Sequence, residues 1–406
     1  MTATPQLKRD QFRQLSVLIA VNFVDMLGFA MVLPLLPFYA LKLQATPEII
    51  GWMIASFSIT QLIASPIWGR VSDKYGRRPA LMIGLLASAC AFLVFGLANA
   101  LWLLFLSRIV QGAGGGTTGV AQAYVSDTVA PSDRARALGW LSAATSAGVM
   151  VGPAIGSLAA HMGREAPGYF AAALCFLNVL AAWKWLPESR PAEKLGQVTQ
   201  RKPVWHGAWE VLRNPGGKVE RLIWVYGMGM LAFSLLTSIL ALWLGSRFGV
   251  NEKTIGYFFV YNGLLALVLR SLLLGPVVDK IGEVWAMRAG AITLGFGLLL
   301  YTTAPTVWSL VFIIPFVPIG TALLFPASTS LISHVADPNE LGTTMGVAQT
   351  FAGIARVIAP IFGTIAFQRL GTNWPFWLGG FTMLCVAGVT FRFVQPAARA
   401  VPAPAT

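Results

Sequence analysis

The sequence predicts an all-α membrane protein with twelve transmembrane helices in two six-helix bundles. Of the 406 residues, 56% are hydrophobic and 11% are charged, whereas a typical soluble protein carries about 25% charged residues. Apolar stretches of about 20 residues, enough for a helix to cross about 30 Å of hydrocarbon, recur along the chain. Helices are expected because lipid offers backbone groups no hydrogen-bond partners. The predicted spans are 15–40, 49–71, 80–98, 101–124, 137–160, 168–185, 221–245, 255–278, 287–303, 307–333, 343–367 and 375–394.

Basic residues gather on one side of the predicted membrane. They are concentrated at 70–78, at Arg134 and Arg136, and from Lys184 to Arg221. By the positive-inside rule, this bias places both termini in the cytoplasm. The formal net charge of +13 therefore indicates membrane topology rather than nucleic-acid binding. We expect a multi-pass protein of the cell (inner) membrane whose first span is retained.

The first span carries Asp25, the only acidic residue that we place inside a span. A carboxylate there costs roughly 2.5 to 3.5 kcal/mol on insertion scales and is tolerated mainly where it faces a cavity or a partner. A carboxyl that loses its charge by taking a proton suits a proton-driven carrier. A structural acid neutralised by a nearby arginine is the alternative.

Arg108 is a basic residue within the fourth span. It lies about eight residues from the outer end of the fourth span, and Asp25 lies about eleven from the inner end of the first, so their depths differ by roughly 5 Å. Arg108 is therefore expected either to pair with Asp25 or to hold the local helix packing. The residues expected to line a central cavity are Asn22, Phe29, Gln111, Tyr261, Asn262, Gln349 and Arg356.

The two halves of the chain repeat each other. Gly69–Gly76 reappears, degraded, as Gly275–Gly282 at an offset of 206, and Gly and Pro positions of the fifth span recur in the eleventh at an offset of 207. Parallel six-helix halves with a site between them near the midplane are a transporter architecture. The bundles are expected at 1–186 and 219–406.

A polar cytoplasmic linker at 187–218 joins the two predicted bundles. Within it, Trp205, Trp209 and Leu212 fall on one helical face. This spacing predicts a short helix on the inner membrane surface, and an unstructured linker is the alternative.

Four segments resemble a known family. Gly69-Arg-Val-Ser-Asp-Lys-Tyr-Gly-Arg-Arg-Pro79 resembles the signature loop of the major facilitator superfamily, and Arg108-Ile-Val-Gln-Gly112 resembles its membrane arginine motif. Gly148-Val-Met-Val-Gly-Pro-Ala-Ile-Gly156 is similar to the motif of its proton-coupled drug antiporters. Asp25-Met-Leu-Gly-Phe-Ala-Met-Val-Leu-Pro-Leu-Leu-Pro37 resembles the first helix of tetracycline exporters. The resemblance covers about 15–395.

The signature loop is expected to gate the inner side. Gly69 and Gly76 permit a close backbone approach and a tight turn, and Asp73 can accept hydrogen bonds at a helix N-terminus. The resemblance implies that this helix is span eleven, near 342–344. It also implies that Arg77 bonds Asp127 and latches the inner side of the outward-facing state. A merely solvated basic loop is the alternative.

The fifth span carries a face of small residues. Gly148, Gly152, Pro153 and Gly156 lie three or four residues apart, so they form one thin helix face with a kink at the proline. The resemblance implies that this face packs against span eight, where the halves rock. Helix packing with no antiporter meaning is the alternative. The chain has Gly156-Ser157 where the family usually has two glycines.

The resemblance implies a monomeric proton-coupled antiporter that exports amphipathic small molecules by alternating access. It would be driven by the proton gradient, with no cofactor and no metal. Tetracycline exporters carry acids in their third and ninth helices, whereas the third and ninth spans here contain none. Beside Asp25, the cations Arg108, Arg270 and Arg356 leave the spans positive, which favours an anionic or zwitterionic ligand and makes tetracycline itself doubtful.

Two rival functions have different signatures. A symporter or facilitator for an anionic metabolite or lysolipid would differ in the direction of pH-driven flux. A non-transporting membrane receptor would have a filled central cavity and no solute flux. An enzyme is not expected, because the sequence shows no paired carboxylates, metal cluster or nucleophile with a base, and Gly112–Gly119 lacks the lysine of a phosphate-binding loop.

Overall fold

The computed structural model describes residues 5–190, 204–269, 272, 274–337 and 340–391. These residues form helices joined by short turns, with no strand among them, which confirms the all-α class. The first group of helices is α1 (Pro5–Val32), α2 (Leu36–Lys42), α3 (Pro47–Tyr75), α4 (Arg77–Gly96), α5 (Leu101–Gly114), α6 (Thr117–Thr128), α7 (Arg134–Ala159) and α8 (Ala166–Trp185). The second is α9 (Val204–Arg213), α10 (Lys218–Phe248), α11 (Ile255–Val268), α12 (Leu274–Ile281), α13 (Glu283–Tyr301), α14 (Leu310–Ile313), α15 (Phe316–Val335), α16 (Leu341–Arg369) and α17 (Trp374–Thr390).

Each predicted span falls on a helix or on a pair of shorter helices. In the described part of the chain, nine helices are long and apolar enough to cross a membrane, and α11 and α17 are shorter apolar helices. The fourth span is divided between α5 and α6 at Gly114–Gly116, where three successive glycines lower the helix propensity. Space is also short there, because a Cβ on Gly116 would lie 2.5 Å from the Trp68 ring. Twelve complete crossings therefore stay a prediction.

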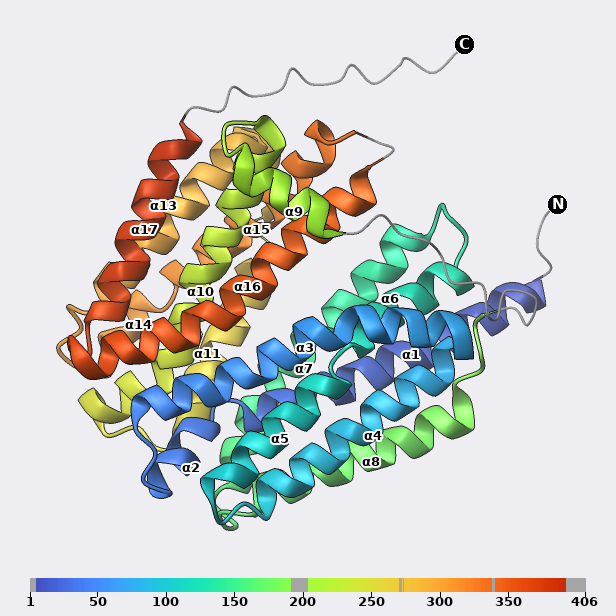
Figure 1. Ribbon diagram of the computed structural model, residues 1–406, viewed down its shortest axis with the longest axis horizontal. Coiled ribbons are helices and arrows are strands. Elements are labelled where there is room, and N and C mark those ends of the chain that lie inside the picture. Colours follow the sequence, from blue (N-terminus) through green and yellow to red (C-terminus); the bar gives the residue numbers. More distant parts are fainter. Residues whose placement is uncertain (1–4, 191–203, 270–271, 273, 338–339, 392–406) are drawn as a thin grey trace.

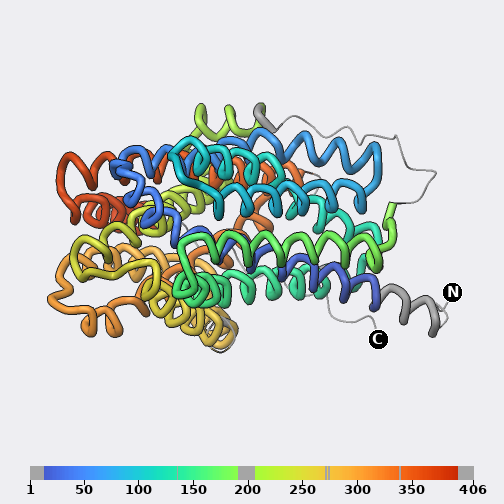
Figure 2. The backbone as a smooth tube through the Cα atoms, turned by 90° about the horizontal axis from the view of Figure 1, so that it is seen from below, coloured from blue at the N-terminus to red at the C-terminus, as the bar shows by residue number. Residues whose placement is uncertain are grey.

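The helices fall into two groups that follow the chain order. Helices α1 to α8 contact one another, and α10 to α17 do the same, while α3 against α16 and α7 against α11 are the main contacts between the groups. Figure 1 shows the two groups as separate bundles, and the view in Figure 2 keeps most of the yellow-to-red helices apart from the blue-to-green ones. We call them the N-terminal half and the C-terminal half.

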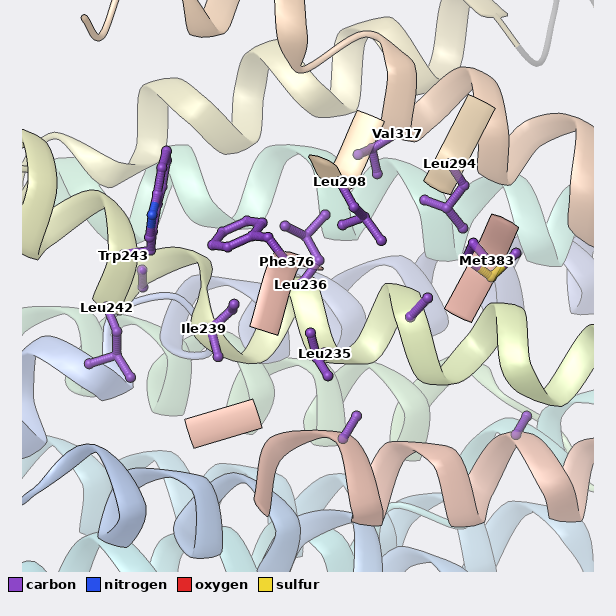
Figure 3. Close-up of a cluster of buried hydrophobic side chains, with 14 of the residues drawn as sticks. Leu235, Leu236, Ile239, Leu242, Trp243, Leu294, Leu298, Val317, Phe376 and Met383 are labelled. Atoms are coloured by element: carbon purple, nitrogen blue, oxygen red, sulfur yellow. The ribbon is translucent and has the colours of Figure 1, made fainter. Parts of the chain in front are cut away.

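The core of the C-terminal half is a continuous apolar layer between α10, α13, α15 and α17. Figure 3 shows Trp243, Leu298, Val317, Phe376 and other side chains converging from these four helices. The Trp243 ring is fully buried and lies 5.0 Å from the Phe376 ring. Between helices in lipid such side chains are held by van der Waals packing rather than by the hydrophobic effect, and here they fill the space between these four helices.

Each half has two ends, which we name by their loops. The basic end holds the turns at 75–77 and 128–134, and the opposite end holds those at 43–46 and 249–254. At the opposite end, α3 and α16 touch closely, since a Cβ on Gly51 would lie 2.6 Å from the Pro360 carbonyl oxygen. Toward the basic end the ribbons of these two helices diverge (Figure 1).

The amphipathic helix predicted in the linker is present as α9. Ala208 and Val211 are buried where α9 packs on α16, whereas Trp209 and Leu212 are exposed. The side chain of Trp205 lies outside the described residues. The contact is close because Gly207 faces Val347, where a Cβ would lie 2.7 Å from a methyl group. The linker helix therefore belongs structurally to the C-terminal half.

Candidate functional site

Asp25 lies inside the N-terminal half, between α1, α4 and α6. Its side chain is buried, with the hydroxyls of Ser88 and Thr117 as hydrogen-bond partners. The carboxyl also borders a pocket about the size of one water molecule. The pocket is lined by Leu18, Val21, Asn22, Asp25, Leu81, Leu85, Thr117 and Ala121. Since these residues of α1 and α4 lie between Asp25 and the basic end, the pocket lies on the basic-end side of the carboxyl.

Asn22 joins two helices of the same half. Its side-chain amide donates to the Thr145 hydroxyl at 2.7 Å and to the Leu141 carbonyl at 3.3 Å, both on α7. Asn22 is buried and lines the small pocket beside Asp25. Asn22 thus connects α1 to α7 and lies next to the Asp25 carboxyl. It does not lie at a surface between the two halves, where the predicted central cavity would be.

Arg108 is buried without a partner for its charge. Its side chain is 1% exposed, and among the described residues none of its three guanidinium nitrogens has a hydrogen-bond partner. The guanidinium lies 5.9 Å from the centre of the Phe95 ring. Phe95 follows Ser88, the neighbour of Asp25, by seven residues of α4, or about 10 Å of helix rise. The two alternatives for Arg108 are thus resolved in this structure: it packs on Phe95 and does not pair with Asp25.

The remaining predicted cavity residues of the N-terminal half lie close to these groups. Gln111 is buried one turn after Arg108, and its side-chain oxygen also has no hydrogen-bond partner in the described part of the chain. Phe29 is half-buried, and its ring centre lies 5.3 Å from that of Phe57 on α3. An unpaired buried polar group is costly, so the Arg108 guanidinium and the Gln111 side-chain oxygen are the unsatisfied polar groups of this region.

In the C-terminal half a residue that the sequence did not single out connects two predicted ones. Gln349 donates to the Tyr226 hydroxyl at 3.1 Å, and Tyr226 also interacts electrostatically with Arg356. The Tyr226 ring meets Phe325 edge-on at 5.7 Å. The role of Tyr226 could not be predicted from the sequence, because its hydrogen bond with Gln349 joins α10 to α16 across 123 residues.

The other two predicted residues of this half lie on α11. The Tyr261 hydroxyl donates to the Val311 carbonyl at 2.7 Å, so it is satisfied within its own half, and Asn262 is half-buried. Arg356 is half-buried too, with one nitrogen donating to the Ala352 carbonyl of its own helix. Arg270 lies outside the described residues.

The signature loop at the basic end contains the pair that the resemblance implies. Arg77 donates to Asp127 at 2.9 Å and to Asp73 at 2.7 Å, and it also bonds the Ser72 hydroxyl. Arg77 is buried although it lies at a loop. These contacts join the ends of α3, α4 and α6 within the N-terminal half.

Asp73 does not bond α16 in this structure, which corrects the expectation for span eleven. Its second partner is Arg190, at 2.8 Å, just after the end of α8. The physical reason is the divergence of α3 and α16 at the basic end (Figure 1). Asp73 is thus neutralised by two arginines of its own half in this state.

The segment after α8 completes the loop. The Glu188 carboxylate accepts from the backbone N–H groups of Arg77 at 2.8 Å and Arg78 at 3.0 Å, and so caps the start of α4. Gly76 has a φ of +105°, and a Cβ there would lie 2.5 Å from the Glu188 carboxylate. Gly76 therefore serves the turn as expected, whereas Gly69 faces open space.

The glycines of α7 pack against α1, not against span eight, which corrects a second expectation. A Cβ on Gly148, Gly152 or Gly156 would lie 2.7, 2.7 or 2.2 Å from a backbone oxygen of α1. The Pro153 carbonyl lies on another side, 2.9 Å from where a Cβ of Gly256 on α11 would be. Four apolar positions at spacings of three and four residues predict a thin face, but they do not identify the neighbour.

Ion pairs and hydrogen bonds join the two halves at the opposite end. Lys42 pairs with Glu252, and Glu48 pairs with Arg369 at 3.2 Å. The backbone N–H of Glu48 also donates to the side-chain oxygen of Gln368 at 3.0 Å. Burial favours a raised pKa for Glu252, but the hydrogen bond and charge of Lys42, a backbone hydrogen bond and the charge of Lys253 together leave that pKa below its usual value.

Comparisons with known proteins point to one family. A sequence profile described as Major Facilitator Superfamily matches residues 18–273 and 222–406. The chain is 28% identical over 378 residues to multidrug resistance protein 2 of Bacillus subtilis (strain 168), covering 92% of this chain and 93% of that protein. It is 29% identical over 389 residues to multidrug resistance protein 1 of the same organism, covering 94% and 97%. It is 25% identical over 380 residues to the class B tetracycline resistance protein of Escherichia coli, covering 91% and 93%.

Solved structures share the fold. The human organic anion transporter MFSD10 (TETRAN) superposes with a TM-score of 0.70 at 22% identity, covering 96% of this chain and 100% of that one. The nucleoside transporter NupG superposes with a TM-score of 0.74 at 15% identity, covering 93% and 99%. At these identities the likeness concerns the arrangement of helices alone.

Proposed function

The chain belongs to the Major Facilitator Superfamily, and from this membership we propose that it exports amphipathic small molecules in exchange for protons. Relatives that match nearly the whole chain are named for multidrug and tetracycline resistance. Export with a broad substrate range fits this set better than uptake of a single metabolite. The observation that carries the proton part of the proposal is Asp25, a buried carboxyl inside the first span.

Asp25 has the surroundings of a group that gains and loses a proton. It lies among hydroxyl groups and apolar side chains, where its neutral form needs no counterion. Its ionised form would be costly at this depth, and the unpaired guanidinium of Arg108 lies in the same half. We assign proton binding to Asp25 and stabilisation of its deprotonated form to Arg108, which would have to approach it in another state.

The contacts between the halves support an inward-facing state in this structure. Polar contacts join the halves at the opposite end, and the small pocket at Asp25 lies toward the basic end. With the basic end in the cytoplasm, as the positive-inside rule predicts, Asp25 would release its proton inward here. Substrate would then enter from the inside, and both would be exchanged outside after the halves rock.

The proton gradient supplies enough energy for this exchange. Roughly 2.3 kcal/mol per 100 mV and about 1.4 kcal/mol per pH unit together give on the order of 4 kcal/mol per proton in an energised cell. This corresponds to about a thousandfold concentration gradient.

Transport into everted membrane vesicles tests the proposal. Three probes are offered: tetracycline, the cation ethidium and the anionic dye fluorescein. We expect an acid interior to drive the accumulation of at least one probe, and a protonophore to collapse it. Accumulation only when the outside is acid would indicate symport, and pH-independent entry would remove the proton from the mechanism.

The cations of the spans give an expectation for the substrate. We propose that Arg356 binds an acidic group of the substrate, because it is half-buried and no acid of the described C-terminal spans neutralises it. Replacing Arg356 by Gln should weaken the binding of an anionic probe about 10- to 100-fold, the usual range for a charge-assisted hydrogen bond. Ethidium binding should be spared. Arg356→Lys keeps the charge and should restore most of the affinity, and equal losses for both probe classes would make the role structural.

The signature loop gives an expectation for turnover. Asp73→Asn removes the charge that holds Arg77 and Arg190 at the basic end, so it should change the balance between the two states of the carrier. A ligand shifts such a balance only by its differential affinity, and we expect transport to fall severalfold while binding in detergent changes little. Asp133→Asn, at an exposed acid of the same end, is the matched control. A parallel loss of binding would move Asp73 into the ligand site.

A further inference from the structure

Ser157 joins the two halves through its side-chain hydroxyl. It is 4% exposed and lies at the end of α7, where its one O–H is within bonding distance of the carbonyl oxygens of Glu252 at 2.9 Å and Lys253 at 2.5 Å. The same oxygen accepts from the backbone N–H of Gly256 at 3.3 Å. The two carbonyls belong to the turn before α11 and the N–H to its first turn, all in the other half.

The start of α11 lacks a cap of its own. The first N–H groups of any helix have no partner within it, and the N-cap residue Thr254 makes no side-chain cap bond. Its hydroxyl is used in the preceding turn, where it accepts from the backbone N–H of Asn251 at 3.1 Å. Backbone carbonyls of the same turn accept from the N–H groups of Ile255 and Tyr257, and Ser157 of the N-terminal half supplies the side-chain acceptor for the N–H of Gly256 between them.

Close packing fixes the hydroxyl in place. A Cβ on Gly256 would lie 2.5 Å from the Ser157 Cβ, and one on Gly263 would lie 2.5 Å from the Met150 side chain. The same turn of the C-terminal half is held by Lys42 through Glu252. Helices α7 and α11 thus meet with little room for another arrangement while the opposite end is closed.

We propose that Ser157 is a lock of the closed opposite end. A glycine at this position would have neither the hydroxyl nor the Cβ that Ser157 uses here. The lock rests on the alternating access of the proposed function, because its bonds exist only while α7 and the start of α11 are together. It must be released each time the carrier opens at that end.

The lock affects the equilibrium between the states that are closed and open at the opposite end, and it does not affect the ligand-binding site. A bond made in one of two states favours that state by its net contribution, and a net hydrogen bond changes such an equilibrium roughly two- to tenfold. Removing the hydroxyl should therefore raise the population that is open at the opposite end by this factor. Ligand affinity measured for the closed state should not change.

Double electron–electron resonance between the halves measures this population. Spin labels are placed at Met162 and Trp308, which are 74% and 80% exposed at the opposite end, one in each half. The exposed Cys90 and Cys385 are replaced by Ala, and the buried Cys175 is kept because it is inaccessible to the label. The distances are recorded in nanodiscs at acidic and at alkaline pH.

The parent protein should give a short and a long distance whose ratio depends on pH. In Ser157→Ala and Ser157→Gly the long distance should gain roughly two- to tenfold over the short one. Ser246→Ala is the matched control, since that hydroxyl lies at the same end and bonds only the Trp243 carbonyl of its own helix. An unchanged ratio in both Ser157 variants would overturn the lock alone. A single distance at every pH would overturn alternating access itself, and the lock with it.

Discussion

Replacing Asp25 by Asn is expected to abolish uphill, proton-driven transport while leaving folding and membrane insertion intact. Asparagine matches the neutral carboxyl in size and can bond Ser88 and Thr117, the partners of Asp25, but it cannot release a proton. Accumulation in everted vesicles should fall from as much as about a thousandfold to the level without a pH gradient. Binding of the probe and the unfolding temperature should change little.

Two comparisons make this result specific. Asp25→Glu keeps a titratable carboxyl and should retain part of the transport. Asp127→Asn removes an acid at the basic end, where it bonds Arg77, and should slow transport without uncoupling it from the proton gradient. Undiminished pH-driven accumulation by the Asp25→Asn protein would show that Asp25 is not the proton-binding residue.

The second large effect is expected at Gly156. A side chain there would meet the carbonyl oxygen of Met31, only 2.2 Å from the position of its Cβ, so α1 and α7 would have to separate. Gly156→Leu should lower the free energy of unfolding by about 1–3 kcal/mol, as overpacked cores do, and bring efflux to background. The thermal unfolding midpoint of the purified protein and efflux from cells measure the two effects.

Gly139→Leu is the matched control for this substitution. Gly139 lies on the same helix and has nothing within 4 Å of where its Cβ would be. A leucine there should be neutral or slightly stabilising, since glycine is the weaker helix former by about 1 kcal/mol. Equal losses at both positions would mean that α7 simply rejects large residues, and that the contact with α1 has no special role.

Much of the fold could be predicted because apolar length and composition are local properties of the sequence. Every predicted span falls on helix, and the triple glycine at 114–116, which divides one of them, is visible in the sequence. The linker helix was predictable from its spacing, and Trp209 and Leu212 of its predicted apolar face are exposed. Its contact with α16 through Ala208 and Val211 was not predicted, because the sequence does not show which helix lies beside it.

The site was harder to predict because its contacts depend on neighbours that are distant in the sequence. Depth estimates brought Arg108 and Asp25 within reach of each other, but they do not tell which side of a helix each side chain takes, and Arg108 packs on Phe95. Arg190 lies in a polar segment with no periodicity, so nothing in the pattern joins it to Asp73, 117 residues earlier. Ser157 stood out only as a departure from a motif.

The contact between α1 and α7 has a mechanical consequence. Three glycines bring the two backbones together, and Asn22 bonds Thr145 across the same seam, so these helices are expected to move as one rigid block. That block carries Asp25 on one helix and Ser157 on the other. A change of charge at Asp25 and a displacement of Ser157 at the opposite end would then occur on the same rigid block. No relay of side-chain rearrangements between Asp25 and Ser157 is required. The stiffness of the contact between α1 and α7 would then determine how strongly protonation of Asp25 is coupled to opening at Ser157.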